Sequence, residues 1–139
     1  MEFIRIVNYA LYIIVGLITF GIGLRFLLSK KFFSYHREAT GLEWNNIDKS
    51  LQMIILAIMK MAGIGITCLS VLIITYPFMF MCSDNFFDKF LVPIISLLFW
   101  IGSFNITFNV HKKTSANTPW KGSLFSTILI VIAILLSVL

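Results

Sequence analysis

The chain has 139 residues, of which 59% are hydrophobic and 12% charged, and its formal net charge is +5 at pH 7. Soluble domains carry about 25% charged residues, so this composition excludes an ordinary water-soluble domain and indicates a protein that lies in a membrane. The charges are few and fall in short connections between apolar runs, which favours anionic lipid headgroups as the electrostatic partner and argues against nucleic acid.

Four apolar runs follow one another along the chain, and each is long enough to cross a hydrocarbon core of about 30 Å. We therefore predict one all-α transmembrane domain over residues 1–139, a membrane four-helix bundle with antiparallel up-down topology. The expected helices cover about residues 6–30, 46–79, 84–110 and 119–138.

The connection over residues 31–45 mixes charged with aromatic side chains, a composition typical of the headgroup region of a membrane. We expect a frayed end of the first helix here, then a turn at Thr40-Gly41. Asn45 or Asn46 is the expected N-cap of the second helix. At 1.5 Å per residue that helix is roughly 50 Å long, so it must tilt, bend or project beyond the bilayer.

The last two helices have their own start signals. Ser83 or Asp84 is expected to cap the third helix. Pro93 is expected to bend that helix, because proline lacks an N–H and its ring clashes with the preceding turn. Thr118 is the expected N-cap of the fourth helix, with Pro119 in its first position.

The distribution of basic residues predicts the orientation, because cytoplasmic connections are enriched in Lys and Arg. Eight of the eleven basic residues lie in or beside the first and third connections: Arg25, Lys30, Lys31, Arg37, Lys49, Lys112, Lys113 and Lys121. We therefore predict that connections 1–2 and 3–4 are cytoplasmic and that both termini lie outside, on the periplasmic side of a bacterial inner membrane.

Lys60 is the interior charge of the predicted second helix. If the bilayer begins at Leu51, Lys60 lies near the midplane, where a lysine is costly, needs a polar partner and is usually functional. If the spanning part is residues 61–82, Lys60 instead extends its side chain to the cytoplasmic interface. The sequence favours the interfacial position without excluding the buried one.

Polar side chains that can bind a ligand gather on the side predicted to be cytoplasmic. The candidate cluster comprises His36, Glu38, Trp44, Gln52, Lys60, Asn105, Asn109, His111 and Trp120. Asn105 and Asn109 are one turn apart and can line a cavity. His36 and Glu38 can do acid–base work there. The alternative is ordinary interfacial hydrogen bonding and helix capping. His36 and His111 lack a third ligand at a recognisable spacing, so we predict neither a metal nor a cofactor.

Small residues recur in the predicted helices, among them the pair Gly63-x-x-x-Thr67, and they let helices approach closely. They pack the helices of one chain together or form an interface between copies of the chain. The sequence has no glycine-rich phosphate loop, HExxH or GxSxG motif, and no acidic residue deep in a predicted span. These absences argue against a catalytic site and against a proton-coupled exporter.

Two stretches, YHREATGLEWNNIDKSLQMIILAIMKMAGIG (residues 35–65) and HKKTSANTPW (residues 111–120), resemble a group of small bacterial four-helix membrane proteins. The shared pattern is a histidine and a tryptophan after the first helix, a Leu-Gln start to the second helix with a later glycine, and a basic-Thr…Pro-Trp start to the fourth. The matching positions are His36, Trp44, Leu51, Gln52, Gly63, Thr114, Pro119 and Trp120. The resemblance implies the fold and a bacterial inner-membrane location. The group has no assigned activity to carry over.

Three functions fit these observations. The preferred one is a non-enzymatic protein that binds a lipid or hydrophobic ligand, or serves as an accessory subunit of a membrane complex. The second is a small membrane enzyme acting on a lipid or quinone headgroup through His36 and neighbouring acids. The third is a transporter formed by oligomerisation at the glycine-bearing faces. The expected partners are membrane lipids, and another membrane protein or further copies of the chain.

Overall fold

The computed structural model describes residues 2–79, 83 and 85–138. Within these ranges the chain is all-helical, with α1 (Glu2–Leu27), α2 (Ser34–Thr40), a 3-10 turn (Trp44–Asn46), α3 (Lys49–Met79), α4 (Phe86–Thr114) and α5 (Trp120–Val138). In the described part of the chain, four helices are long and apolar enough to cross a membrane: α1, α3, α4 and α5. This confirms the all-α class and the four predicted spans, which indicate an integral membrane protein.

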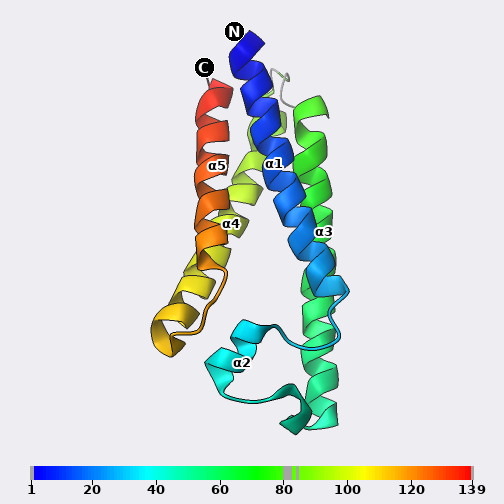
Figure 1. The fold of residues 1–139 in the computed structure, drawn as a ribbon. Coiled ribbons are helices and arrows are strands. Elements are labelled where there is room, and N and C mark those ends of the chain that lie inside the picture. The colour runs from blue at the N-terminus through cyan, green and yellow to red at the C-terminus, as the bar shows by residue number, and fades with distance from the viewer. Residues whose placement is uncertain (1, 80–82, 84, 139) are drawn as a thin grey trace.

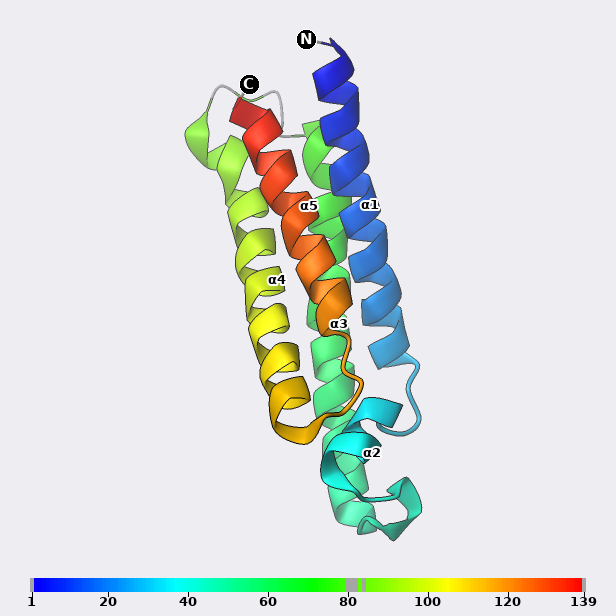
Figure 2. The ribbon, with the colours of Figure 1, turned by 60° about the vertical axis from the view of Figure 1, so that its left-hand side comes forward.

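The four long helices pack side by side, and α2 lies at one end of them (Figures 1 and 2). α1 packs along α3 and α4 along α5, while α1 also contacts α5 and α3 contacts α4. Both termini lie at the end opposite α2 (Figure 1). We call these the terminal end and the α2 end.

Glycines allow α1 and α3 to approach closely. A Cβ atom at Gly23 would lie 2.9 Å from the backbone nitrogen of Thr67, and one at Gly63 would lie 2.9 Å from that of Leu27. Only glycine fits such contacts, so small residues here serve packing within one chain, as predicted for Gly63. By contrast, a Cβ at Gly65 would meet no atom within 4 Å.

The buried core is narrow and includes polar groups. Tyr12, Ile73, Tyr76 and Trp100 are among its largest members, each 2% exposed or less. At the terminal end, the buried Asn8 side-chain amide donates to Ser137 Oγ at 2.8 Å and so joins α1 to α5. This contact between residues far apart in sequence fixes which two spans are neighbours.

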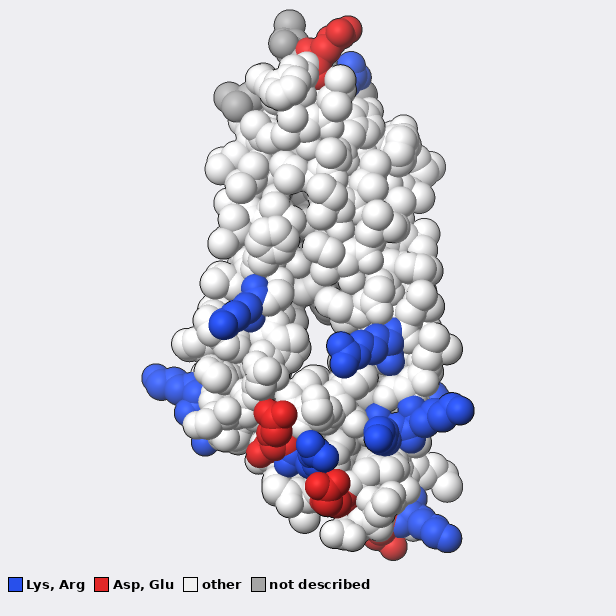
Figure 3. Space-filling view, viewed as in Figure 1, with Lys and Arg blue, Asp and Glu red and all other residues white. Residues whose placement is uncertain are grey.

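The outer surface of the four long helices is apolar. At most 28% of each candidate span is buried within the chain, and large side chains such as Leu17, Ile58, Leu98 and Leu135 are exposed. Figure 3 shows the middle of this face free of charge, with Lys, Arg, Asp and Glu gathered mainly at the α2 end. Such a surface suits hydrocarbon rather than water.

The first connection differs from the prediction. α1 ends at Leu27, and residues 34–40 form the separate helix α2 instead of a frayed extension of α1. Gly41 terminates α2 with φ of 68°, a left-handed conformation that glycine adopts without strain, and its N–H bonds to the Arg37 carbonyl. The predicted turn at Thr40-Gly41 is therefore confirmed, but it follows a helix that the sequence did not predict.

α3 starts at Lys49, three residues later than expected. Asp48 Oδ2 accepts a hydrogen bond from the Ser50 N–H at 2.9 Å, so Asp48 caps the helix. Asn45 and Asn46 lie in the 3-10 turn instead, and their predicted capping role is wrong. The first turns of α3 extend beyond the end of α1 (Figures 1 and 2).

The ends of α4 and α5 also shift. Asn85 caps α4 by accepting from the Phe87 N–H at 3.2 Å, while Asp84 lies outside the described residues. α4 continues through Pro93 to Thr114.

α5 begins at Trp120. The Thr118 hydroxyl does not cap it but donates to the Thr107 carbonyl at 2.8 Å, so its predicted role is wrong. That bond ties the α4–α5 connection back onto α4.

Candidate functional site

A cavity of about 420 Å³ lies between the long helices near the α2 end. Its apolar lining comes from residues including Ile18, Ile22, Ile66 and Phe99, and its polar lining comes from α1, α2, α4 and α5. The surface in Figure 3 is hollowed at this level, between the uncharged middle of the molecule and its charged end. The cavity is therefore apolar toward the membrane interior and polar toward the α2 end.

A row of polar side chains on α4 forms one wall. Trp100, Ser103 and Thr107 line the cavity at helical spacing, and Ser123 of α5 joins them. The hydroxyls of Ser103 and Ser123 lie 3.1 Å apart and form a hydrogen bond across the two helices. This bond closes the wall between α4 and α5.

Trp100 contributes a buried hydrogen-bond donor to this wall. Its side chain is 2% exposed, and its indole Nε1 has no hydrogen-bond partner among the residues that the structure describes. A buried N–H without an acceptor costs about 1–3 kcal/mol.

Arg25 lies at the edge of the cavity, in the last turn of α1. Its guanidinium lies 5.1 Å from the centre of the Phe33 ring. It forms no ion pair with any described carboxylate. Burial raises the pKa of the neighbouring Tyr35, and the charge of Arg25 only partly opposes that change. Tyr35 is thus a neutral phenol beside an uncompensated cation.

His36 has a structural role at the start of α2. Its Nδ1 accepts a hydrogen bond from the Phe33 N–H at 3.3 Å. Burial lowers the pKa of His36, and its ring lies 4.1 Å from that of Tyr35. The imidazole is therefore neutral at pH 7, and its Nδ1 lone pair is already engaged.

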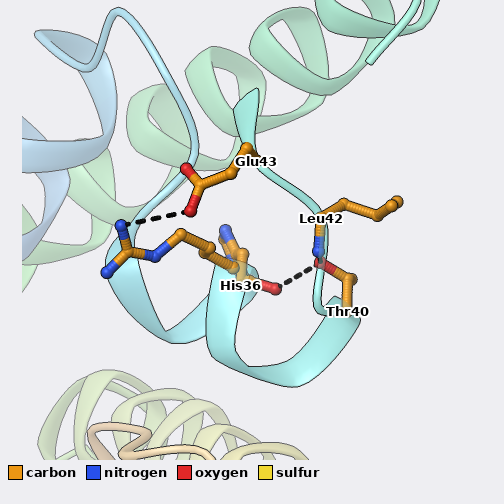
Figure 4. A network of polar contacts seen from close by, with 5 residues as sticks. His36, Thr40, Leu42 and Glu43 are labelled. Atoms are coloured by element: carbon orange, nitrogen blue, oxygen red, sulfur yellow. Dashed lines mark hydrogen bonds and ion pairs between the residues drawn. The ribbon is translucent and has the colours of Figure 1, made fainter. Parts of the chain in front are cut away.

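Polar contacts also fix the turn that follows α2 (Figure 4). The Thr40 hydroxyl donates to the His36 carbonyl at 2.8 Å and accepts from the Leu42 N–H at 3.3 Å. Arg37 and Glu43 form an ion pair at 3.6 Å. Both partners are largely exposed, so the pair itself adds little stability.

Glu38 joins the two connections at the α2 end. Its carboxylate accepts from the Asn117 N–H at 2.8 Å, across 79 residues of sequence. This bond holds α2 against the α4–α5 connection. Ser34 and Tyr35 of α2 line the cavity at its α2 end. Glu38 is engaged in positioning α2.

Four more members of the predicted cluster have structural partners, namely Trp44, Gln52, His111 and Trp120. Gln52 donates to the carbonyls of Trp44 and Ile47 at 2.8 and 2.9 Å. His111 Nδ1 lies 2.7 Å from the Ala116 carbonyl and donates to it, and its ring lies 5.9 Å from that of Trp120. These contacts match the alternative of capping and interfacial hydrogen bonding.

Lys60, Asn105 and Asn109 are exposed and do not line this cavity. The expectation that the two asparagines line it is wrong, because the inward face of α4 carries Trp100, Ser103 and Thr107 instead. Lys60 lies nearly one turn from Gly63, which contacts Leu27 at the end of α1. This places Lys60 near the level at which α1 ends.

The predicted cluster is thus divided into separate groups, and the residues that line the cavity were mostly missed. The signal for them was present: Ser96, Trp100, Ser103 and Thr107 recur at spacings of three and four along α4. Among the described residues, no three His, Cys, Asp or Glu side chains come together as they would around a metal ion.

Comparison of the chain with protein-family models, with curated proteins and with solved structures finds no match. The resemblance to small bacterial four-helix membrane proteins therefore stays a prediction.

Proposed function

We propose that this chain is a small integral membrane protein that binds a lipid or another hydrophobic molecule in the cavity between its four long helices, without acting on it chemically. The observation that carries the proposal is the cavity itself, with its apolar inner lining and its polar edge. Its volume of about 420 Å³ falls in the range of ligand sites, roughly 300–1,000 Å³. The apolar outer surface gives lipid direct access to the chain.

The proposal includes an arrangement in the membrane. The four long helices form an antiparallel up-down bundle, with both termini periplasmic and the α2 end in the cytoplasm of a bacterial cell. Two observations support this: both termini lie at one end (Figure 1), and basic side chains gather at the other (Figure 3).

An enzymatic role receives less support. The residues expected to do acid–base work, His36 and Glu38, are engaged with the backbone N–H groups of Phe33 and Asn117. Reaction at the α2 end would have to disrupt the contacts that hold α2 in place.

Trp100 provides a direct test, because it lines the cavity and is almost fully buried. It becomes the only tryptophan of the chain in the double variant Trp44→Phe/Trp120→Phe. We expect a lipid with brominated acyl chains, added to this variant in dodecyl maltoside micelles, to quench the Trp100 emission in a saturable manner. Quenching that rises only in proportion to the added lipid would contradict a site.

Gly122→Phe supplies the blocking variant. Gly122 lines the cavity, and a Cβ there would meet no atom within 4 Å, so a side chain can start at this position without a clash at its Cβ. We expect it to weaken binding at least about tenfold, or about 1.4 kcal/mol. Gly21→Phe is the matched control, because Gly21 has equally open surroundings but does not line the cavity. Equal binding by the two variants would place the lipid elsewhere.

A further inference from the structure

We propose that the molecule bound in the cavity is a membrane lipid with an anionic phosphate headgroup, and that Arg25 binds this headgroup at the edge of the cavity. This inference rests on the proposed function and names its ligand class. Three features carry it: a second hollow beside the cavity, the charge of that hollow, and its level in the membrane.

The second hollow is a groove of about 510 Å³ on the outside of the first connection. Arg25, Phe33 and Ser34 line both this groove and the inner cavity. These residues therefore lie between the two spaces, with apolar lining on the inner side and basic lining on the outer side. A molecule that fills both has an apolar chain joined to a headgroup.

The charge of the groove is positive. Arg25, Lys30 and Lys31 line it, and no described carboxylate does. The acids at this end are engaged elsewhere, since Glu43 pairs with Arg37 and Glu38 accepts from the Asn117 N–H. An exposed guanidinium has five N–H donors and suits bidentate contact with phosphate. Charge complementarity thus favours an anionic headgroup over a zwitterionic one.

The depth of the groove along the candidate spans also matches the position of a lipid headgroup. Arg25 lies in the last turn of a candidate span, where a headgroup meets the hydrocarbon region. Phe32, Phe33 and Trp44 line the groove, and aromatic side chains concentrate at this depth in membranes. A headgroup at Arg25 directs its chain along α1 into the cavity lined by Ile18 and Ile22. A free phosphate ion would leave that apolar space unused.

Arg25 also has a simpler role open to it, because a cation in the last turn of a helix interacts favourably with the helix dipole. That role gives no preference among lipids. A headgroup preference that depends on Arg25 separates the two roles.

The experiment compares the binding of phosphatidylglycerol and phosphatidylcholine with identical acyl chains to the full-length chain in dodecyl maltoside. We expect phosphatidylglycerol to bind about tenfold more tightly, and Arg25→Gln to reduce this ratio to about twofold or less with phosphatidylcholine binding unchanged. Arg25→Lys is expected to keep part of the preference, because it retains the charge but loses the planar fork. Lys121→Gln is the matched control: it removes one positive charge from a residue that does not line the groove.

Each outcome decides between the proposals. If neither lipid binds, the proposed function fails. If both lipids bind equally, or if Arg25→Gln and Lys121→Gln have equal effects, the cavity ligand stands and the headgroup assignment is overturned. Inorganic phosphate alone is added as a competitor: failure to displace phosphatidylglycerol supports a lipid, while displacement at micromolar phosphate would show a free-anion site and overturn the inference. Unchanged phosphatidylcholine binding also shows that the variants are folded.

Discussion

Tyr76 and Pro93 illustrate how single residues decide the packing of these helices. Proline has no N–H, so Pro93 cannot donate to the carbonyl of Lys89 four residues earlier in α4. The Tyr76 hydroxyl of α3 donates to that carbonyl at 2.6 Å. Within a membrane an unpaired carbonyl is costly, and a neighbouring helix commonly supplies the missing donor. Pro93 thus leaves an acceptor through which α3 is bonded to α4.

We expect Tyr76→Phe to lower the free energy of unfolding by about 1 kcal/mol, because the Lys89 carbonyl loses its donor. The ring contact with Tyr12, whose centroid lies 4.7 Å away, is retained. In a Pro93→Ala background the alanine N–H serves the same carbonyl, so Tyr76→Phe should then cost less. Reversible unfolding in mixed detergent micelles measures all four members of this cycle. Additive effects would show that the tyrosine and the proline are not coupled.

Residue types were easier to predict from the sequence than residue neighbours. The sequence placed Arg25 among the basic residues in or beside the first connection, but the cavity beside it depends on how α4 and α5 turn their polar faces inward. Asn105 and Ser103 lie two positions apart in one helix, and rotation of that helix decides which faces the cavity. The rotation follows from contacts with other helices, such as the Ser103–Ser123 hydrogen bond, which the sequence of α4 alone does not contain.

At the scale of elements, α2 depends on the rest of the molecule. A helix of seven residues is too short to be stable by itself, so tertiary contacts must hold it. These include the Glu38 bond to Asn117 and the T-shaped contact between Phe26 and Phe33 at 4.8 Å. This explains why sequence patterns missed α2, whereas the long apolar runs predicted the four long helices correctly.

The start of α2 should respond to pH through His36. Burial lowers the pKa of His36 below its ordinary 6.5, so the folded α2 binds the proton less tightly than the unfolded segment does. The stabilisation of α2 is therefore complete above about pH 6.5 and is lost progressively as the pH falls. Protonated Nδ1 also cannot accept from the Phe33 N–H. We expect faster hydrogen exchange of the amides over residues 36–40 at low pH, after correction for intrinsic rates.

His36→Asn is the control for this prediction, because its side-chain oxygen can accept from the Phe33 N–H but does not titrate in this range. Exchange in that variant should stay slow between about pH 5 and 8. A variant that keeps the full pH response would assign the titration to another group.

At the scale of the whole molecule, the two ends differ in chemistry. The terminal end is held by buried contacts such as that between Asn8 and Ser137, while the α2 end has the basic groove and the cavity. α3 takes part in this difference between the ends, because Met59 of α3 packs against Phe32 and Ile47 of the first connection. The proposed lipid site and most of the charge thus lie at the same end of the molecule.

The proposed orientation leads to the last prediction. In the proposed orientation, the basic residues at the α2 end keep that end in the cytoplasm, so both termini should face the periplasm. With Cys68 and Cys82 replaced by serine, single cysteines at Glu2 and Lys112 report the two sides of the membrane. A membrane-impermeant maleimide should label Glu2→Cys in intact bacterial cells and label Lys112→Cys only after permeabilisation. Labelling of Lys112→Cys in intact cells would invert the orientation, and the Arg25 groove would then meet the outer leaflet instead of the anionic lipids of the cytoplasmic one.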